Sequence, residues 1–73
     1  MVPLTMMQEG SEGNVSRVKA GKGLQRRLIE MGFTENARIR LLRTDRRSLI
    51  VAVNDSTYAL SKGIAMKVLV SVN

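Results

Sequence analysis

The segment that decides the fold covers residues 22–33 and reads "KGLQRRLIEMGF". Leu24, Leu28 and Met31 follow the i, i+4, i+7 spacing of one helix face, and no other part of the chain shows this spacing as clearly. The pattern predicts an amphipathic α-helix over residues 24–31. We expect its apolar face to be buried against the rest of the domain.

Glycines mark both ends of this helix. Gly32 follows the last turn, where a residue in the left-handed conformation commonly ends a helix, and Phe33 is expected to fold back onto that turn. The preceding loop at residues 20–23 resembles a phosphate-binding loop, but it lacks a Ser or Thr after the lysine and a preceding buried parallel strand. We therefore interpret its glycines as residues that let the chain turn sharply into the helix.

The other face of the helix is charged, with one apolar exception. Arg26 and Glu30 have the i, i+4 spacing of an ion pair, which would contribute about 0.3 kcal/mol. Ile29 lies roughly 140° from Leu24 on the helical wheel, outside the buried stripe. Two interpretations of Ile29 stay open: it is covered by a neighbouring loop, or it contributes to a surface that contacts another protein.

The rest of the chain has the pattern of short β-strands. The expected strands are residues 14–19, 37–41, 49–53, 56–60 and 68–72. Val15 and Val18 have different parities, which indicates an irregular or bulged first strand. Residues 54–55 form a two-residue hairpin turn, and Ser61 is placed to cap a single helical turn at residues 62–66.

This order predicts a mainly β fold, namely a small, strongly bent, five-stranded antiparallel barrel with one helix after its first strand. Closure of the barrel is expected to remove exposed strand edges. The 73 residues are expected to form a single domain, residues 1–73. The chain is 44% hydrophobic but contains one Phe, one Tyr and no Trp, so the core must consist mainly of aliphatic side chains. Phe33 and Tyr58 are expected to lie in that core.

The composition argues against catalysis. The chain has no His and no Cys, which removes the usual nucleophile–base pairs, the usual zinc ligands and disulfides. Its six acidic residues are scattered, with no spacing that brings two carboxylates onto one face. We expect a binding protein, not an enzyme, without a cofactor. The longest apolar run, residues 49–53, is far too short to span a bilayer, and no signal peptide is visible, so we expect a cytoplasmic protein.

A net charge of +6 and a pI near 10.9 are consistent with a nucleic-acid ligand or an anionic membrane surface. However, the arginines are spread over several elements, and only Arg38 and Arg40 clearly share a strand face. The two aromatic residues are expected in the core and not on a stacking platform. A basic nucleic-acid-binding barrel is therefore the less favoured alternative.

The segment "GKGLQRRLIEMGFTENARIRLLR", followed by "LIVAVNDSTYALSKGIAMKVLV", resembles the FeoA family of small cytoplasmic proteins in bacterial ferrous iron transport. The resemblance covers nearly the whole chain. It implies an SH3-like barrel with an inserted helix, and an accessory role through contact with the G-protein part of the membrane transporter FeoB. The loop at residues 44–48 departs from the family by lacking glycine and proline.

The helix is the segment that we expect to contact this partner, and the expected contact residues are Leu24, Arg26, Arg27, Ile29 and Glu30. Similar domains form the C-terminal part of DtxR-type repressors, so a metal-responsive regulatory domain is a second alternative. Metal ligands remain unassigned, because a chain without His or Cys offers Fe(II) only oxygen ligands. Indirect contact with the inner membrane surface and weak self-association are further expectations.

Overall fold

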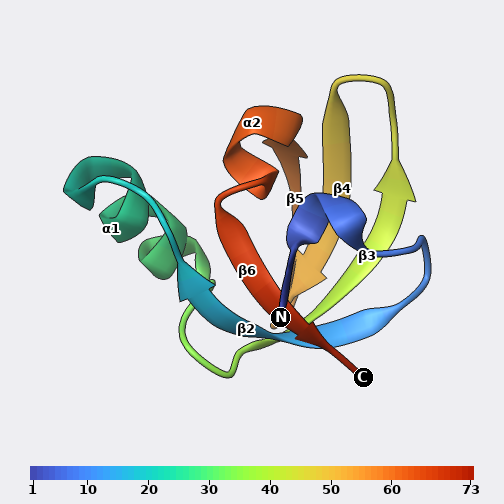
Figure 1. The fold of residues 1–73 in the computed structure, drawn as a ribbon, viewed down its shortest axis with the longest axis horizontal. Coiled ribbons are helices and arrows are strands. Elements are labelled where there is room, and N and C mark those ends of the chain that lie inside the picture. Colours follow the sequence, from blue (N-terminus) through green and yellow to red (C-terminus); the bar gives the residue numbers. More distant parts are fainter.

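The computed structural model describes all residues from Met1 to Asn73. A six-stranded antiparallel sheet in the order β1-β6-β2-β3-β4-β5 curves into a barrel, and helix α1 lies to one side of it (Figure 1). The elements are β1 (Val2–Pro3), the 3-10 helix η1 (Leu4–Met6), β2 (Glu12–Val18), α1 (Lys22–Met31), β3 (Arg38–Thr44), β4 (Ser48–Val53), β5 (Ser56–Ser61), α2 (Lys62–Ala65) and β6 (Val68–Val72).

The fold is mainly β and SH3-like, as predicted, but it has one strand more than the five that the sequence indicated. Val2–Pro3 forms a two-residue strand against Leu69 and Val70 of β6. So short a strand leaves no periodic pattern, and only a partner distant in sequence stabilises it. Helix α1 also begins two residues earlier than predicted, at Lys22.

Several local predictions are confirmed. The register of β2 against β6 shifts between Val15 and Arg17, which is the irregularity expected from the mismatched valines. Val53 pairs with Ser56 across the predicted two-residue turn, where Asn54 has a φ of 54°. The hydroxyl of Ser61 accepts a hydrogen bond from the backbone N–H of Ile64 at 3.2 Å, as expected of an N-cap.

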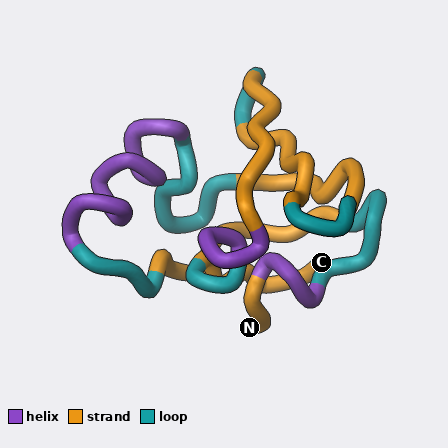
Figure 2. Tube along the Cα trace, turned by 90° about the horizontal axis from the view of Figure 1, so that it is seen from above, coloured by secondary structure: helices purple, strands orange, loops and turns teal.

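The hydrogen-bonded sheet does not close into a full ring, because β1 and β5 are its two ends. The expected removal of strand edges by closure is therefore wrong. Instead, η1 and α2 pack against each other and against β4, β5 and β6. In the view of Figure 2, η1 and α2 lie next to each other between the two ends of the sheet.

The core contains 15 buried hydrophobic residues and no buried polar or charged residue. Ile39 and Leu41 point inward from β3 while Arg38 and Arg40 are exposed, so the predicted alternation is confirmed. Phe33 is fully buried, and Tyr58 is half-buried with its ring centroid 6.1 Å from that of Phe33. The two aromatic rings therefore pack together in the barrel, as expected.

Candidate functional site

Helix α1 ends as the sequence predicted. Gly32 has a φ of 113°, and its N–H donates a hydrogen bond to the carbonyl of Ile29 at 3.0 Å. The N–H of Phe33 donates to the carbonyl of Leu28 at 2.9 Å. This left-handed C-cap turns the chain so that the Phe33 side chain enters the core immediately after the helix.

The inner face of α1 fixes the helix to the barrel. Leu28 is 1% exposed, and Leu24 and Met31 are half-buried and pack against the core. The predicted stripe is thus correct, with Leu28 as its deepest member. Leu24, one of the predicted contact residues, thus belongs to this inner stripe.

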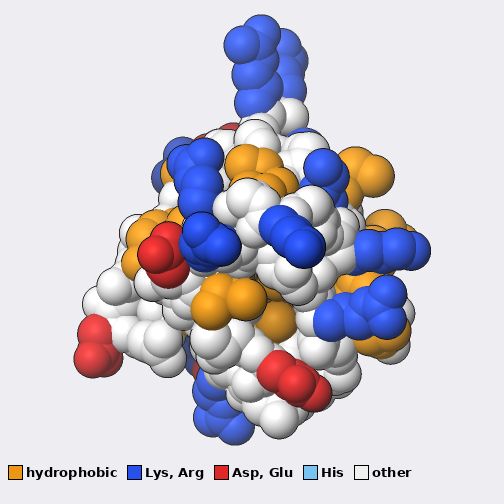
Figure 3. Space-filling model, turned by 90° about the vertical axis from the view of Figure 1, so that its left-hand side faces the viewer, with side chains coloured by type: hydrophobic (Ala, Val, Ile, Leu, Met, Phe, Trp, Pro, Cys, Tyr) orange, Lys and Arg blue, Asp and Glu red, His pale blue; other side chains and the backbone are white.

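The outer face of α1 is charged around one aliphatic side chain. Arg26, Arg27 and Glu30 are exposed, and Ile29 is 46% exposed. The ion pair that their spacing predicted for Arg26 and Glu30 is not formed. The two salt bridges of the structure join other residues. Figure 3 shows this side of the molecule, with hydrophobic side chains surrounded by basic and acidic ones.

Two hollows flank Ile29. The first is a groove of about 240 Å³ between α1, β2 and the chain after the helix, lined by Val15, Ser16, Arg17, Val18, Gln25, Ile29, Phe33, Thr34 and Glu35. The second, of about 300 Å³, lies on the outer face of α1 and is lined by Lys22, Gln25, Arg26, Ile29 and Glu30. Ile29 and Gln25 line both hollows, whereas Leu24 and Arg27 line neither. We call the residues around both hollows the α1 surface.

The groove exists because β2 leaves β3 early. The ladder of the two strands runs from Glu12 to Asn14. Val15 still exchanges backbone hydrogen bonds with Ala37 and Asn36, and β2 then bulges and continues along β6. The side chain of Gln25 reaches across from α1 and donates a long hydrogen bond, 3.5 Å, to the carbonyl of Val18. The second half of β2 therefore faces α1, with the groove between them.

No loop covers Ile29, so the first of the two interpretations of this residue is wrong. Ile29 forms the apolar rim shared by the two hollows and keeps nearly half of its surface exposed. Arg17 and Glu35 add one charge of each sign to the groove. The α1 surface can thus accept an apolar side chain in the groove and pair charges around it, which is the chemistry of a protein contact.

The acidic side chains of the structure do not gather into a metal-binding cluster. No three His, Cys, Asp or Glu side chains come together as a group that could hold a metal ion. The shortest carboxylate contact is an ion pair between strands β3 and β2, in which Arg40 donates to Glu12 from Nε at 3.2 Å and from Nη2 at 2.6 Å. The hydrogen bond and charge of Arg40 hold the pKa of Glu12 below its usual value.

Two of the strand arginines are paired with carboxylates. Arg40 is paired with Glu12 and Arg43 with Asp45, as part of exposed salt bridges. No helix in the structure is both long and apolar enough to cross a bilayer.

The FeoA domain family matches residues 2–72 of the chain. The chain belongs to the FeoA family. FeoA proteins are accessory proteins of ferrous iron transport. A protein of Methanocaldococcus jannaschii with the provisional name Fe(2+) transport protein A is 33% identical over 70 residues, which cover 96% of this chain and 85% of that protein.

Solved FeoA structures share the fold. An iron uptake regulatory protein, FeoA, is 32% identical with a TM-score of 0.91, covering 99% of this chain and 97% of the other. The zinc-complexed FeoA of Stenotrophomonas maltophilia, described as a prokaryotic SH3 domain protein, is 25% identical with a TM-score of 0.86 over 97% and 91%. A manganese-dependent transcriptional repressor shows the same fold at 23% identity, with a TM-score of 0.88, although the match covers only 36% of that chain.

Sequence reasoning missed part of the α1 surface. Gln25, Arg17, Thr34 and Glu35 line the groove but were not among the predicted contact residues. Gln25 lies between the apolar stripe and the outer face, and the other three belong to flanking elements whose position depends on the β2 bulge. The helical wheel of α1 alone therefore contains no signal for the groove.

Proposed function

We propose that this FeoA-family protein, acting as a single domain, binds the cytosolic G-protein part of a FeoB-type ferrous iron transporter through the α1 surface. The observation that carries the proposal is Ile29, an exposed aliphatic side chain on the rim of two hollows and flanked by Arg26 and Glu30. A central apolar anchor within a charged rim is the usual arrangement at a protein–protein contact.

The test replaces Ile29 with Asp and Arg26 with Glu in one variant. Both side chains are exposed, so we expect the fold to be retained, and we expect the affinity for the detergent-solubilised transporter to fall at least about tenfold, as for a central interface residue. The matched control is Leu42→Asp with Arg38→Glu on β3, where Leu42 is 43% exposed and the charge change is the same. Calorimetry or surface plasmon resonance would measure both.

The control variant should bind like the unmodified protein. If both variants weaken binding equally, the effect comes from net charge and not from the α1 surface. If the Ile29 and Arg26 variant binds with unchanged affinity, the contact surface lies elsewhere on the domain. GTP hydrolysis by the transporter, measured with and without each variant, would then separate a regulatory contact from one that only assembles the transporter.

A further inference from the structure

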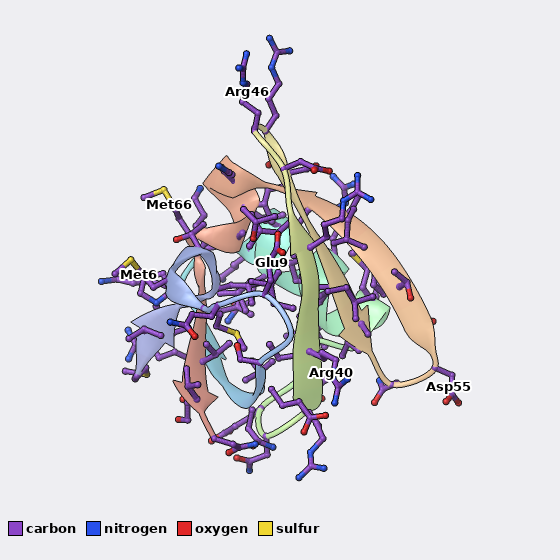
Figure 4. All side chains as sticks on the ribbon, turned by 90° about the vertical axis from the view of Figure 1, so that its right-hand side faces the viewer. Met6, Glu9, Arg40, Arg46, Asp55 and Met66 are labelled. Carbon is purple, nitrogen blue, oxygen red and sulfur yellow. The ribbon has the colours of Figure 1, made fainter.

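A second surface, which shares no residue with the α1 surface, combines exposed methionines with unpaired cations. Met6 of η1 is 70% exposed and Met66, the C-cap of α2, is 61% exposed. Because η1 and α2 pack against each other, these two residues from opposite ends of the chain project from the same side of the molecule (Figure 4). Because both side chains are exposed, packing in the core does not explain why methionine stands at either position.

Two lysines flank Met66. Lys62 and Lys67 lie at the two ends of the α2 region and are exposed. The backbone N–H of Lys62 donates to the carbonyl of Arg47 at 3.1 Å, which brings the tip of the β3–β4 hairpin to the start of α2. Arg46 and Arg47 at this tip are also exposed. We call Met6, Met66, Lys62, Lys67, Arg46 and Arg47 the methionine–lysine face.

Acidic residues are nearly absent from the segments that build this face. Residues 1–8 and 56–73 contain no Asp or Glu. At the hairpin, Asp45 accepts a hydrogen bond from Arg43 at 3.4 Å, and the carboxylate of Glu9 accepts the backbone N–H of Thr44 at 2.7 Å. Both carboxylates near the hairpin thus have partners of their own, and neither forms a salt bridge with a cation of the face.

The shape of this face is as informative as its charge. In Figure 4, Met66 and Met6 project from the same side of the molecule, and Arg46 projects at the hairpin tip beyond them. Both hollows of the structure are lined by α1 residues and not by this face. A basic surface that has no hollow and carries isolated flexible apolar side chains suits a planar anionic partner better than a peptide that needs a groove.

We propose that the methionine–lysine face docks directly on the surface of a bilayer that contains anionic phospholipids. The four cations would contact lipid phosphates, and the thioether side chains of Met6 and Met66 would enter the region between headgroups and acyl chains. A second copy of the chain is a poorer occupant, because it would place like charges opposite each other. This proposal does not depend on the transporter contact, since α1 and the methionine–lysine face share no residue.

The first test is co-sedimentation of the full chain with vesicles. We expect binding to vesicles of phosphatidylethanolamine and phosphatidylglycerol at about 50 mM NaCl, much weaker binding at about 500 mM NaCl, and little binding to phosphatidylcholine vesicles. Lys62→Glu with Lys67→Glu should weaken binding at least about 25-fold, since each surface cation contributes about fivefold. Circular dichroism confirms that the variants are folded.

The matched control is Arg26→Glu with Arg27→Glu, which makes the same charge change on α1. This control should weaken vesicle binding far less than the lysine variant. Equal weakening would mean that only the net charge of +6 attracts the protein to lipid, and the assignment of the face would be overturned. Absence of binding to anionic vesicles at low salt would overturn it as well, and would leave an acidic protein as the partner of this face.

The second test follows the methionines. The chain has no Trp, so Met66→Trp supplies a single fluorescent reporter. We expect its emission to shift to shorter wavelength on addition of phosphatidylglycerol vesicles and to be quenched by brominated acyl chains. A Trp placed at Ile29 on α1 should show neither change. If the Met66→Trp protein binds vesicles with an unchanged spectrum, the methionines do not enter the bilayer and that part of the proposal is wrong.

Discussion

A single methyl group at Gly13 should destabilise the domain, although its backbone conformation suits any residue. Gly13 lies in β2 between two paired strands, opposite Ile39 of β3 and Val72 of β6. A Cβ atom at this position would lie 2.6 Å from the carbonyl oxygen of Ser71. That oxygen belongs to the backbone of β6, so it cannot rotate away as a flexible side chain could.

The size of the effect follows from this contact. Relief of the contact requires β6 to move away from β2, and overpacking of this kind typically costs about 1–3 kcal/mol. We therefore expect Gly13→Ala to lower the free energy of unfolding by about 2 kcal/mol. In a domain of this length that corresponds to a decrease in Tm of roughly 12 °C.

The control is the same substitution on α1. A Cβ atom at Gly23 would meet no other segment within 4 Å, and this glycine lies in the first turn of the helix. Gly23→Ala should raise stability by about 0.5 kcal/mol, because alanine favours helix over glycine. Urea unfolding followed by circular dichroism would measure both variants. If Gly13→Ala were as stable as the original protein, the close approach of β2 and β6 would not constrain this position.

Two further predictions concern packing and pH. Leu28→Ala should lower the free energy of unfolding by about 3 kcal/mol, because it leaves a cavity under α1. Ile29→Ala on the outer face should change the same free energy by less than about 0.5 kcal/mol. Equal effects of the two substitutions in urea unfolding would contradict the burial pattern. The pKa of Glu12 is lower in the folded protein than in the unfolded chain, because Arg40 pairs with its carboxylate. The stabilisation from this pair is therefore complete at pH values above the usual carboxyl pKa. It is lost as the pH falls through the lower pKa of the folded state. The urea midpoint of Glu12→Gln should therefore fall less between about pH 6 and pH 3 than that of the original protein, and parallel pH profiles would argue against the pairing.

The parts of the fold that could be predicted are those specified by neighbouring residues. Gly32 and Phe33 define the end of α1 because a left-handed glycine needs no tertiary context. The Asn54 turn and the Ser61 cap are likewise encoded within a few residues. For the candidate site, the helical wheel correctly placed Ile29 on the outer face of α1.

The parts that could not be predicted depend on contacts between distant segments. The strand at Val2–Pro3 exists only because β6 pairs with it. The mismatched valines indicated that β2 is irregular, but no local pattern showed that its second half would face α1 across a groove.

The pairing of β1 with β6 has a practical consequence. Because Val2 lies opposite Val70, the chain enters and leaves the domain at neighbouring points (Figure 1). A domain with adjacent ends can be inserted into a surface loop of a host protein through short linkers without stretching either partner. A circularly permuted version with new ends at the tip of the β3–β4 hairpin, which lines neither hollow, is also feasible. Such a version would leave α1 and its groove intact, and a label could be attached at the new ends.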